Sequence, residues 1–215
     1  MHKSILAFIP ARKGSKGLKF KNFKLVKNKP LINYTVEAAV KSKIFSEIVI
    51  STDHSNTIKN FKDYKDIHIH NRPRNLSNDK SLVVEALKHF LKNNDKSFDY
   101  IMILQPTSPL RKITDIKKSY FYFINSNADT LVSVYRVDDH HPSRMYEIKN
   151  KLLKPLDAKN YSKRRQDLSK IYHRNGAIYL FKNSNLKNNT IYGKKIIPYI
   201  MPINRSLNID NRIDL

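Results

Sequence analysis

The residues best suited to chemistry lie in one short loop near the start of the chain. The loop follows the apolar run Ile5–Ile9 and reads Pro10-Ala11-Arg12-Lys13-Gly14-Ser15-Lys16-Gly17, with Lys19, Lys21 and Asn22 directly after it. The chain has only 4 glycines in 215 residues, and two of them are in this loop. Glycine lets backbone N–H groups turn toward an anion, and the nearby cations add charge. The loop therefore predicts a site for a phosphate-rich ligand, with a basic surface turn as the simpler alternative.

Two common phosphate-binding motifs are absent. Neither Gly-x4-Gly-Lys-Ser/Thr nor Gly-x-Gly-x-x-Gly occurs in the sequence. Their absence argues against P-loop and dinucleotide-binding proteins.

A second candidate loop, Gln105–Arg111, follows the apolar run Tyr100–Leu104. The Gln105 amide can donate and accept hydrogen bonds, as recognition of a sugar requires. Pro106 and Pro109 restrict the backbone and would hold that amide in place. Without other context, these prolines are equally typical of an ordinary rigid turn.

The elements that must position these loops alternate between strand-like and helix-like segments. Five short apolar runs predict strands, at Ile5–Ile9, Ile48–Ile50, Ile67–Ile69, Tyr100–Leu104 and Leu131–Tyr135. Amphipathic stretches predict helices at Leu31–Val40, Val83–Leu91 and Ile113–Ile124, and Asp79 is expected to cap the second. This alternation predicts an α/β fold with a mostly parallel, doubly wound sheet, in which ligands bind beyond the carboxyl ends of the strands.

From about Arg136 the pattern changes. Met145–Leu156 predicts a short hairpin, and strand character returns at Ala177–Phe181 and Ile196–Pro202. We therefore expect a single domain over residues 1–215 with a small β-containing insertion at about residues 140–172. That insertion would suit a lid or a dimer contact.

Composition narrows the function classes. Lys and Arg outnumber Asp and Glu by 41 to 18, which gives a net charge of +23. Such a charge is compatible with nucleic acid, but no recognisable nucleic-acid-binding motif accompanies it, so nucleic acid is an unlikely partner. The chain has no cysteine, no histidine pair with convincing metal spacing, and no apolar run near the ~18 residues of a membrane span. A soluble cytoplasmic protein without a membrane partner is expected.

Several stretches together resemble the acylneuraminate cytidylyltransferases, the CMP-sialic acid synthetases. They are Ile9–Gly17 with Lys21-Asn22, Lys29–Glu37, Ser51–Asp53, Leu104–Arg111 and Asn175–Tyr179. The segments Arg164–Leu168 and Tyr192–Pro202 look closest to the legionaminic-acid branch. The resemblance implies a Rossmann-like nucleotidyltransferase that transfers a cytidylyl group from CTP to a nine-carbon 2-keto sugar acid and releases pyrophosphate.

The resemblance also implies roles for individual residues. Arg12, Lys16 and Lys21 would hold the triphosphate, and Gly14, Ser15, Gly17 and Asn22 would complete the nucleotide site. Arg72 and Ser81 would read the cytosine. The sugar acid would lie against Gln105, Thr107, Ser108 and Asn175, with Arg165 or Arg174 (and Arg164 as a further candidate) pairing with its carboxylate. A homodimer is implied as well.

Magnesium, or manganese in its place, is the implied cofactor. The family usually has Asp-x-Asp near the C-terminus, where this chain has Asn208-Ile209-Asp210. Residues 208 and 210 of an extended segment share one face, so Asp210 and the amide oxygen of Asn208 could both reach the ion. We expect an active enzyme that needs more magnesium than its relatives.

Three alternatives remain open from the sequence. The chain could use CTP with the eight-carbon acid 3-deoxy-manno-octulosonate. It could be a weak or catalytically silent family member that only binds nucleotide. It could also be a basic nucleic-acid-binding protein.

Overall fold

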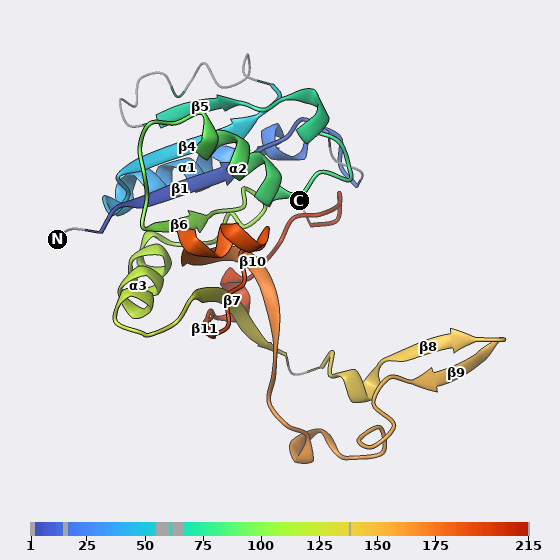
Figure 1. The fold of residues 1–215 in the computed structure, drawn as a ribbon. Helices are drawn as coiled ribbons and strands as arrows, with labels where there is room; N and C mark the ends of the chain where they lie inside the picture. The colour runs from blue at the N-terminus through green and yellow to red at the C-terminus, as the bar shows by residue number, and fades with distance from the viewer. Residues whose placement is uncertain (1–2, 15–16, 55–60, 62–66, 138, 215) are drawn as a thin grey trace.

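A seven-stranded sheet forms the centre of the fold (Figure 1). The computed structural model describes residues 3–14, 17–54, 61, 67–137 and 139–214. The strand order is β11-β7-β10-β6-β1-β4-β5. The strands are β1 (Ile5–Pro10), β4 (Glu47–Thr52), β5 (Ile67–Asn71), β6 (Tyr100–Ile103), β7 (Thr130–Val137), β10 (Ile171–Lys182) and β11 (Ile196–Ile200).

Strand β10 is the exception to a parallel arrangement. It pairs antiparallel with both β6 and β7, whereas β6, β1, β4 and β5 run parallel to one another and β11 runs parallel to β7. The expected strands and the mostly parallel α/β class are confirmed. The sequence did not reveal that β10 begins at Ile171, six residues before the apolar run Ala177–Phe181.

Helices cover both faces of the sheet, as a doubly wound fold requires. Helices α1 (Leu31–Ser42) and α3 (Ile113–Ile124) pack on one face through Ile32, Val36, Ile116 and Phe123. Helix α2 (Val83–Lys92) packs on the other through Ala86, Leu87 and Phe90. The apolar side chains of β1 alternate between these two clusters, so this strand is buried on both sides. It leads into the loop of residues 11–22, called the glycine loop below.

The expected cap of helix α2 was wrong. Helix α2 begins after Leu82, whose backbone N–H donates to the Glu85 carboxylate at 2.9 Å. Asp79 instead pairs with Arg12 across 2.9 Å. Glu85 lies in the first turn and can reach the cap backbone, which leaves Asp79 available to the loop after β1.

Strands β8 (Tyr146–Lys149) and β9 (Leu152–Pro155) form a separate antiparallel hairpin that extends away from the sheet (Figure 1). Several of its apolar side chains are exposed, including Ile148 at 76%, Leu152 at 72% and Leu153 at 66%. The extent of the domain and of the insertion stays a prediction.

The remaining short elements connect these layers. Strands β2 (Leu25–Val26) and β3 (Lys29–Pro30) form a small hairpin, and the 3-10 helices are Lys21–Phe23, Arg74–Leu76, Pro142–Arg144, Arg165–Asp167, Asn183–Asn188 and Ile203–Arg205. Within the part of the chain that the structure describes, no helix is long and apolar enough to cross a membrane.

Candidate active site

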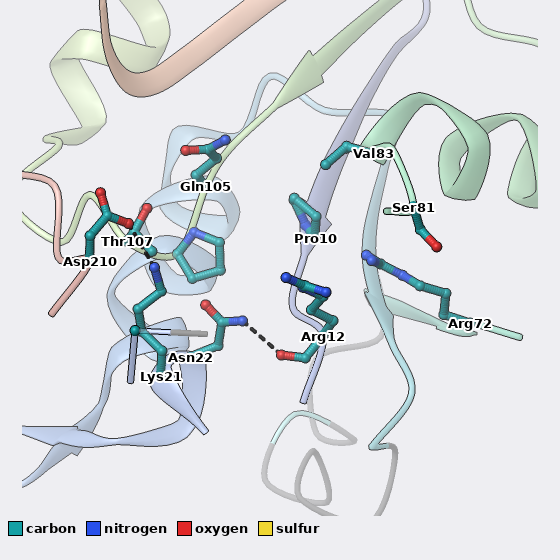
Figure 2. A pocket seen from close by; sticks show the side chains of 12 residues that line it. Pro10, Arg12, Lys21, Asn22, Arg72, Ser81, Val83, Gln105, Thr107 and Asp210 are labelled. Atoms are coloured by element: carbon teal, nitrogen blue, oxygen red, sulfur yellow. Dashed lines mark hydrogen bonds and ion pairs between the residues drawn. The ribbon is translucent and has the colours of Figure 1, made fainter. Parts of the chain in front are cut away.

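A cavity of about 540 Å³ lies where β1, β5 and β6 end. Chain segments far apart in the sequence meet there, which is where the fold predicts a ligand site. The lining residues are Pro10, Arg12, Gly17, Lys21, Asn22, Arg72, Ser81, Val83, Gln105, Pro106, Thr107 and Asp210. Figure 2 shows Arg12, Arg72 and Ser81 on one side of this cavity and Lys21, Asn22, Thr107 and Asp210 on the other.

The glycine loop contacts residues 206–210, which are called the C-terminal segment below. Lys21 Nζ lies 2.8 Å from Asp210 Oδ1. A Cβ on Gly17 would lie 2.6 Å from the backbone oxygen of Asp210, so this close approach requires glycine. The Ile209 N–H donates to the Thr107 carbonyl at 2.8 Å, which also fastens the segment to the loop after β6.

Arg12 and Asn22 are held close to the end of β1. The buried Asn22 amide donates to the Arg12 carbonyl at 3.0 Å, which fixes the backbone of the glycine loop (Figure 2). The Asn22 side chain therefore both supports the glycine loop and lines the cavity. The Arg12 guanidinium pairs with Asp79, a residue that sequence reasoning placed elsewhere.

Arg72 is buried against the end of β4. Its Nε donates to Ser51 Oγ and its Nη2 to the Ser51 carbonyl, both at 3.0 Å. Burial lowers the pKa of Arg72 to about 10, with nearby Asp53 opposing that shift. The guanidinium thus stays charged near neutral pH and faces the cavity as a fixed cation.

A second cavity of about 430 Å³ adjoins the first, sharing Val83 and Gln105 with it. Its polar members are Gln105, Arg174, Tyr179, Asn189, Thr190 and Tyr192, and its apolar members are Leu82, Val83, Val84, Ile103 and Ile191. Arg174 Nη1 lies 2.6 Å from the Tyr192 hydroxyl, and its guanidinium lies over the Tyr179 ring at 5.9 Å. Burial raises the pKa of Tyr179, so its hydroxyl stays protonated near neutral pH. No phenolate of Tyr179 then pairs with the Arg174 guanidinium in place of a ligand.

Two residues that sequence reasoning did not assign hold Gln105 in place. Arg111 is buried and donates to the carbonyls of Gln105 at 3.3 Å and Ala177 at 2.6 Å, and to Thr35 Oγ1 at 2.6 Å. Burial lowers its pKa to about 9. Gly176, at a φ of +75°, leaves room for the Gln105 side chain, because a Cβ there would lie 2.7 Å from Gln105 Oε1.

Asn175 is buried behind the site and contacts Ser133, Met201 and Ser206. These bonds connect β7, β10 and the C-terminal segment, so the observed role of Asn175 is to hold that segment. The resemblance implied that Asn175 contacts the sugar acid. In the structure Asn175 lines neither cavity, so that contact stays a prediction.

Among the described residues, four further expected site residues, Gly14, Ser108, Arg164 and Arg165, line neither cavity. Gly14 is exposed, Ser108 is buried, and Arg165 is exposed with Asp139 at 3.9 Å. Arg164 pairs with Asp167 at 2.9 Å. Ser15 and Lys16 lie outside the described residues, so their expected roles stay predictions.

The residues expected to bind a metal are brought together. The Asn208 amide nitrogen donates to Asp210 Oδ2, which places both side chains on one face as the spacing predicts. Asn208 Oδ1 is buried and has no hydrogen-bond partner among the described residues. A carboxylate and an amide oxygen are ligands that a hard cation takes, but the nitrogen of the Asn208 amide faces Asp210, so the amide would have to turn to present its oxygen to an ion there. The described residues contain no group of three or more acidic, His or Cys side chains that could hold a metal alone. Substrate oxygens would have to complete the coordination.

The family model for cytidylyltransferases matches residues 6–205, which includes every element that lines the two cavities except the segment after Arg205. The chain belongs to the cytidylyltransferase family.

Relatives of this chain act on acidic sugars, according to their names. The N-acylneuraminate cytidylyltransferase of Escherichia coli O18:K1:H7 is 34% identical over 100% of this chain and 51% of its own length. The pseudaminic acid cytidylyltransferase of Campylobacter jejuni serotype O:2 is 31% identical over 98% of this chain and 92% of its own length. The chain therefore spans about half the length of the N-acylneuraminate relatives, but nearly all of the pseudaminic acid relative.

Solved structures share the α/β fold of this chain. A CMP:2-keto-3-deoxy-manno-octonic acid synthetase complexed with CTP has a TM-score of 0.68 and 13% identity, covering 98% of this chain and 94% of its own. A 4-diphosphocytidyl-2C-methyl-D-erythritol synthase from Anaerococcus prevotii also has a TM-score of 0.68 and 13% identity, covering 100% and 95%. At this identity the likeness extends to the fold alone.

Proposed function

We propose that this cytidylyltransferase joins CTP to a nine-carbon 2-keto sugar acid and releases pyrophosphate. The observation that carries the proposal is the pair of adjoining cavities that share Gln105. The first has Arg12, Lys21 and Arg72 around it, which suits a triphosphate. The second has Arg174 beside two tyrosines, which suits a sugar carboxylate and its hydroxyls.

The proposed reaction is an in-line displacement at the α-phosphorus of CTP. The anomeric oxygen of the sugar forms the new P–O bond, the bond from the α-phosphorus to the bridging oxygen breaks, and pyrophosphate leaves while the hydroxyl proton passes to solvent. Such a reaction depends mainly on positioning and on neutralising charge. Lys21 and Arg12, with Lys16 as expected from the sequence, would stabilise the triphosphate oxygens. Arg72 and Ser81 would contact the cytosine, and Asn22 would keep the glycine loop in place.

Magnesium, or manganese, is the proposed cofactor. Asp210 and the unpartnered oxygen of Asn208 would hold it, with substrate phosphates as the other ligands. When bound, the ion would supply positive charge to the triphosphate. The Asp210 carboxylate contacts the Lys21 ammonium. An ion held by Asp210 would therefore lie near Lys21, and both positive charges would act on the oxygens of the same triphosphate.

The apolar wall of the second cavity favours an acylated, partly deoxygenated acid of the legionaminic type. Val84, Ile103 and Ile191 offer methyl groups where a fully hydroxylated chain would need hydrogen-bond partners. N-acyl and methyl substituents would bury against them favourably.

We also propose that the chain works as a homodimer in the cytoplasm, where nucleoside triphosphates are available. The exposed apolar side chains of the β8–β9 hairpin form a surface that a second copy would cover. Arg165 lines neither cavity of its own chain, so it would reach a sugar acid only in the site of the partner copy.

The decisive experiment measures pyrophosphate release with each of the four nucleoside triphosphates and a panel of sugar acids. We expect release with CTP alone, fastest with an N-acylated nine-carbon acid that lacks the terminal hydroxyl. Preference for the eight-carbon 3-deoxy-manno-octulosonate would refute the assignment of the acid. No release with any combination would refute the enzymatic function.

A further inference from the structure

A continuous row of hydrogen-bonded side chains lies behind Arg72, leading away from the first cavity. Ser51 Oγ accepts from Arg72 Nε at 3.0 Å and lies 2.9 Å from His70 Nδ1. His70 Nε2 lies 2.9 Å from His89 Nδ1 on helix α2. Ser51 is fully buried and His70 and Arg72 are each 7% exposed, so water does not compete for the contacts of Ser51 with Arg72 and His70. His89 is half-buried.

For neutral imidazoles the Ser51–His70 hydrogen bond could run in either direction, but only one direction gives the proton of the fully buried Ser51 hydroxyl an acceptor among the described residues. Arg72 has no acceptor, so Ser51 Oγ must accept from it. The single hydroxyl proton of Ser51 has no other acceptor among the described residues, so we assign it to His70 Nδ1, which is then unprotonated. His70 therefore carries its proton on Nε2 and donates it to His89 Nδ1, which leaves the proton of His89 on its own Nε2.

This arrangement leaves one end of the Arg72 guanidinium for a ligand. Nε and Nη2 donate to the side chain and carbonyl of Ser51. Nη1 makes no hydrogen bond to any other described residue, and Arg72 lines the cavity. A guanidinium fixed in this way loses little conformational freedom when it binds a ligand.

We propose that Ser51, His70 and His89 are positioning residues for nucleotide recognition, which hold the Arg72 guanidinium in its binding orientation. This inference rests on the proposed function, in which the first cavity takes CTP. His70 acts by accepting the Ser51 proton, which directs the oxygen lone pairs of Ser51 toward Arg72. His89 acts one step further back by fixing the ring of His70.

The surroundings of His70 keep it in the neutral form that this role needs. Burial, followed by the nearby His89, Arg72 and His68, lowers the pKa of His70 to about 4. Phe90 packs against its ring at 5.6 Å and offers no charge. His70 is therefore neutral throughout the neutral range, as acceptance at Nδ1 requires.

The test compares CTP binding, measured by calorimetry without sugar acid, among His70→Leu, His70→Asn and Ser51→Ala variants. The amide oxygen that His70→Asn introduces can replace Nδ1 as an acceptor, whereas a leucine side chain cannot. We expect His70→Leu and Ser51→Ala to weaken CTP binding roughly three- to tenfold, the size of one net hydrogen bond. His70→Asn should restore most of the affinity. His68→Asn, at an exposed position two residues earlier in the same strand, is the matched control and should bind as the wild type does.

The outcomes separate this inference from the proposed function. If the wild-type chain does not bind CTP, the proposed function fails. If the wild type binds and both His70→Leu and Ser51→Ala bind equally well, the positioning role is refuted. Equal weakening by His70→Leu and His70→Asn also refutes it, because bulk rather than the acceptor would then matter. In steady-state assays the KM for CTP should rise in His70→Leu while the KM for the sugar acid stays unchanged, a split that general loss of structure would not produce.

Discussion

Replacing Gly176 with alanine should damage both stability and use of the sugar acid. Gly176 adopts a φ of +75°, in the left-handed region, and a Cβ there would lie 2.7 Å from Gln105 Oε1. A left-handed conformation costs an L-residue about 1–2 kcal/mol. At about 2–4 °C per kcal/mol for a chain of this size, the melting temperature should fall by about 2–8 °C.

The same methyl group would displace the Gln105 amide, because the end of that side chain is flexible and must move. Losing one neutral hydrogen bond to the sugar acid costs about 0.5–1.5 kcal/mol, which corresponds to a roughly two- to thirteenfold higher KM. The KM for CTP should change less, since its charged contacts come from other residues.

The assay is thermal unfolding together with KM values for both substrates. Gly14→Ala is the matched control for the melting temperature, because a Cβ at Gly14 meets no described atom within 4 Å. Combining Gly176→Ala with Gln105→Ala provides a double-mutant cycle. If Gly176 acts through Gln105, the double variant should have the same sugar-acid KM as Gln105→Ala. Full additivity of the two effects, or an unchanged melting temperature in Gly176→Ala, would refute the reasoning.

Three further predictions follow from other parts of the site. Asp210→Ala should lower the rate of pyrophosphate release by about 10²-fold or more, and Asn208→Asp should lower the magnesium concentration for half-maximal rate. Full activity of the first variant or an unchanged metal requirement in the second would remove these residues from the mechanism. Arg111→Met should lower the free energy of unfolding by about 2–4 kcal/mol, because it leaves buried acceptors at Ala177 and Thr35 unpaired. Lys112→Met, at the neighbouring exposed residue, should change it little. Equal effects of the two variants in denaturant titrations would contradict this reasoning. The pKa of His70 is about 4 in the folded chain and about 6.5 when unfolded, so the unfolded state takes up more protons between these values and stability falls as the pH falls through that window. Urea titrations at pH 6.5 and 4.5 should show a loss on the order of 2 kcal/mol that is smaller in His70→Asn, and an equal loss in both proteins would show that His70 is not responsible.

The sequence by itself determined the fold class and most of the lining of the first cavity. Alternating apolar runs and amphipathic stretches predicted the parallel strands and their helices, because burial on both faces of a sheet leaves a strong local pattern. Scarce glycines beside lysines marked the loop after β1, since a close backbone approach tolerates no side chain. The motif at Gln105 and the Asn208–Asp210 spacing likewise identified residues that the structure brings together.

Only the tertiary structure showed which distant residues support them. Asp79 was expected to cap helix α2, but its carboxylate reaches Arg12, which no local pattern records. Ser51, His70 and His89 come from three separate elements and meet only because β4 pairs with β5 and helix α2 packs over that edge. Arg111 bonds the Gln105 carbonyl and Gly176 leaves room for the Gln105 side chain, and both contacts join the loop after β6 to β10 across the sheet. The spacing of apolar residues along the chain indicates which face of a strand or helix a residue occupies. Contacts between elements depend on the order of the strands and on how helices pack over them, and the spacing of residues within one element carries no information on either.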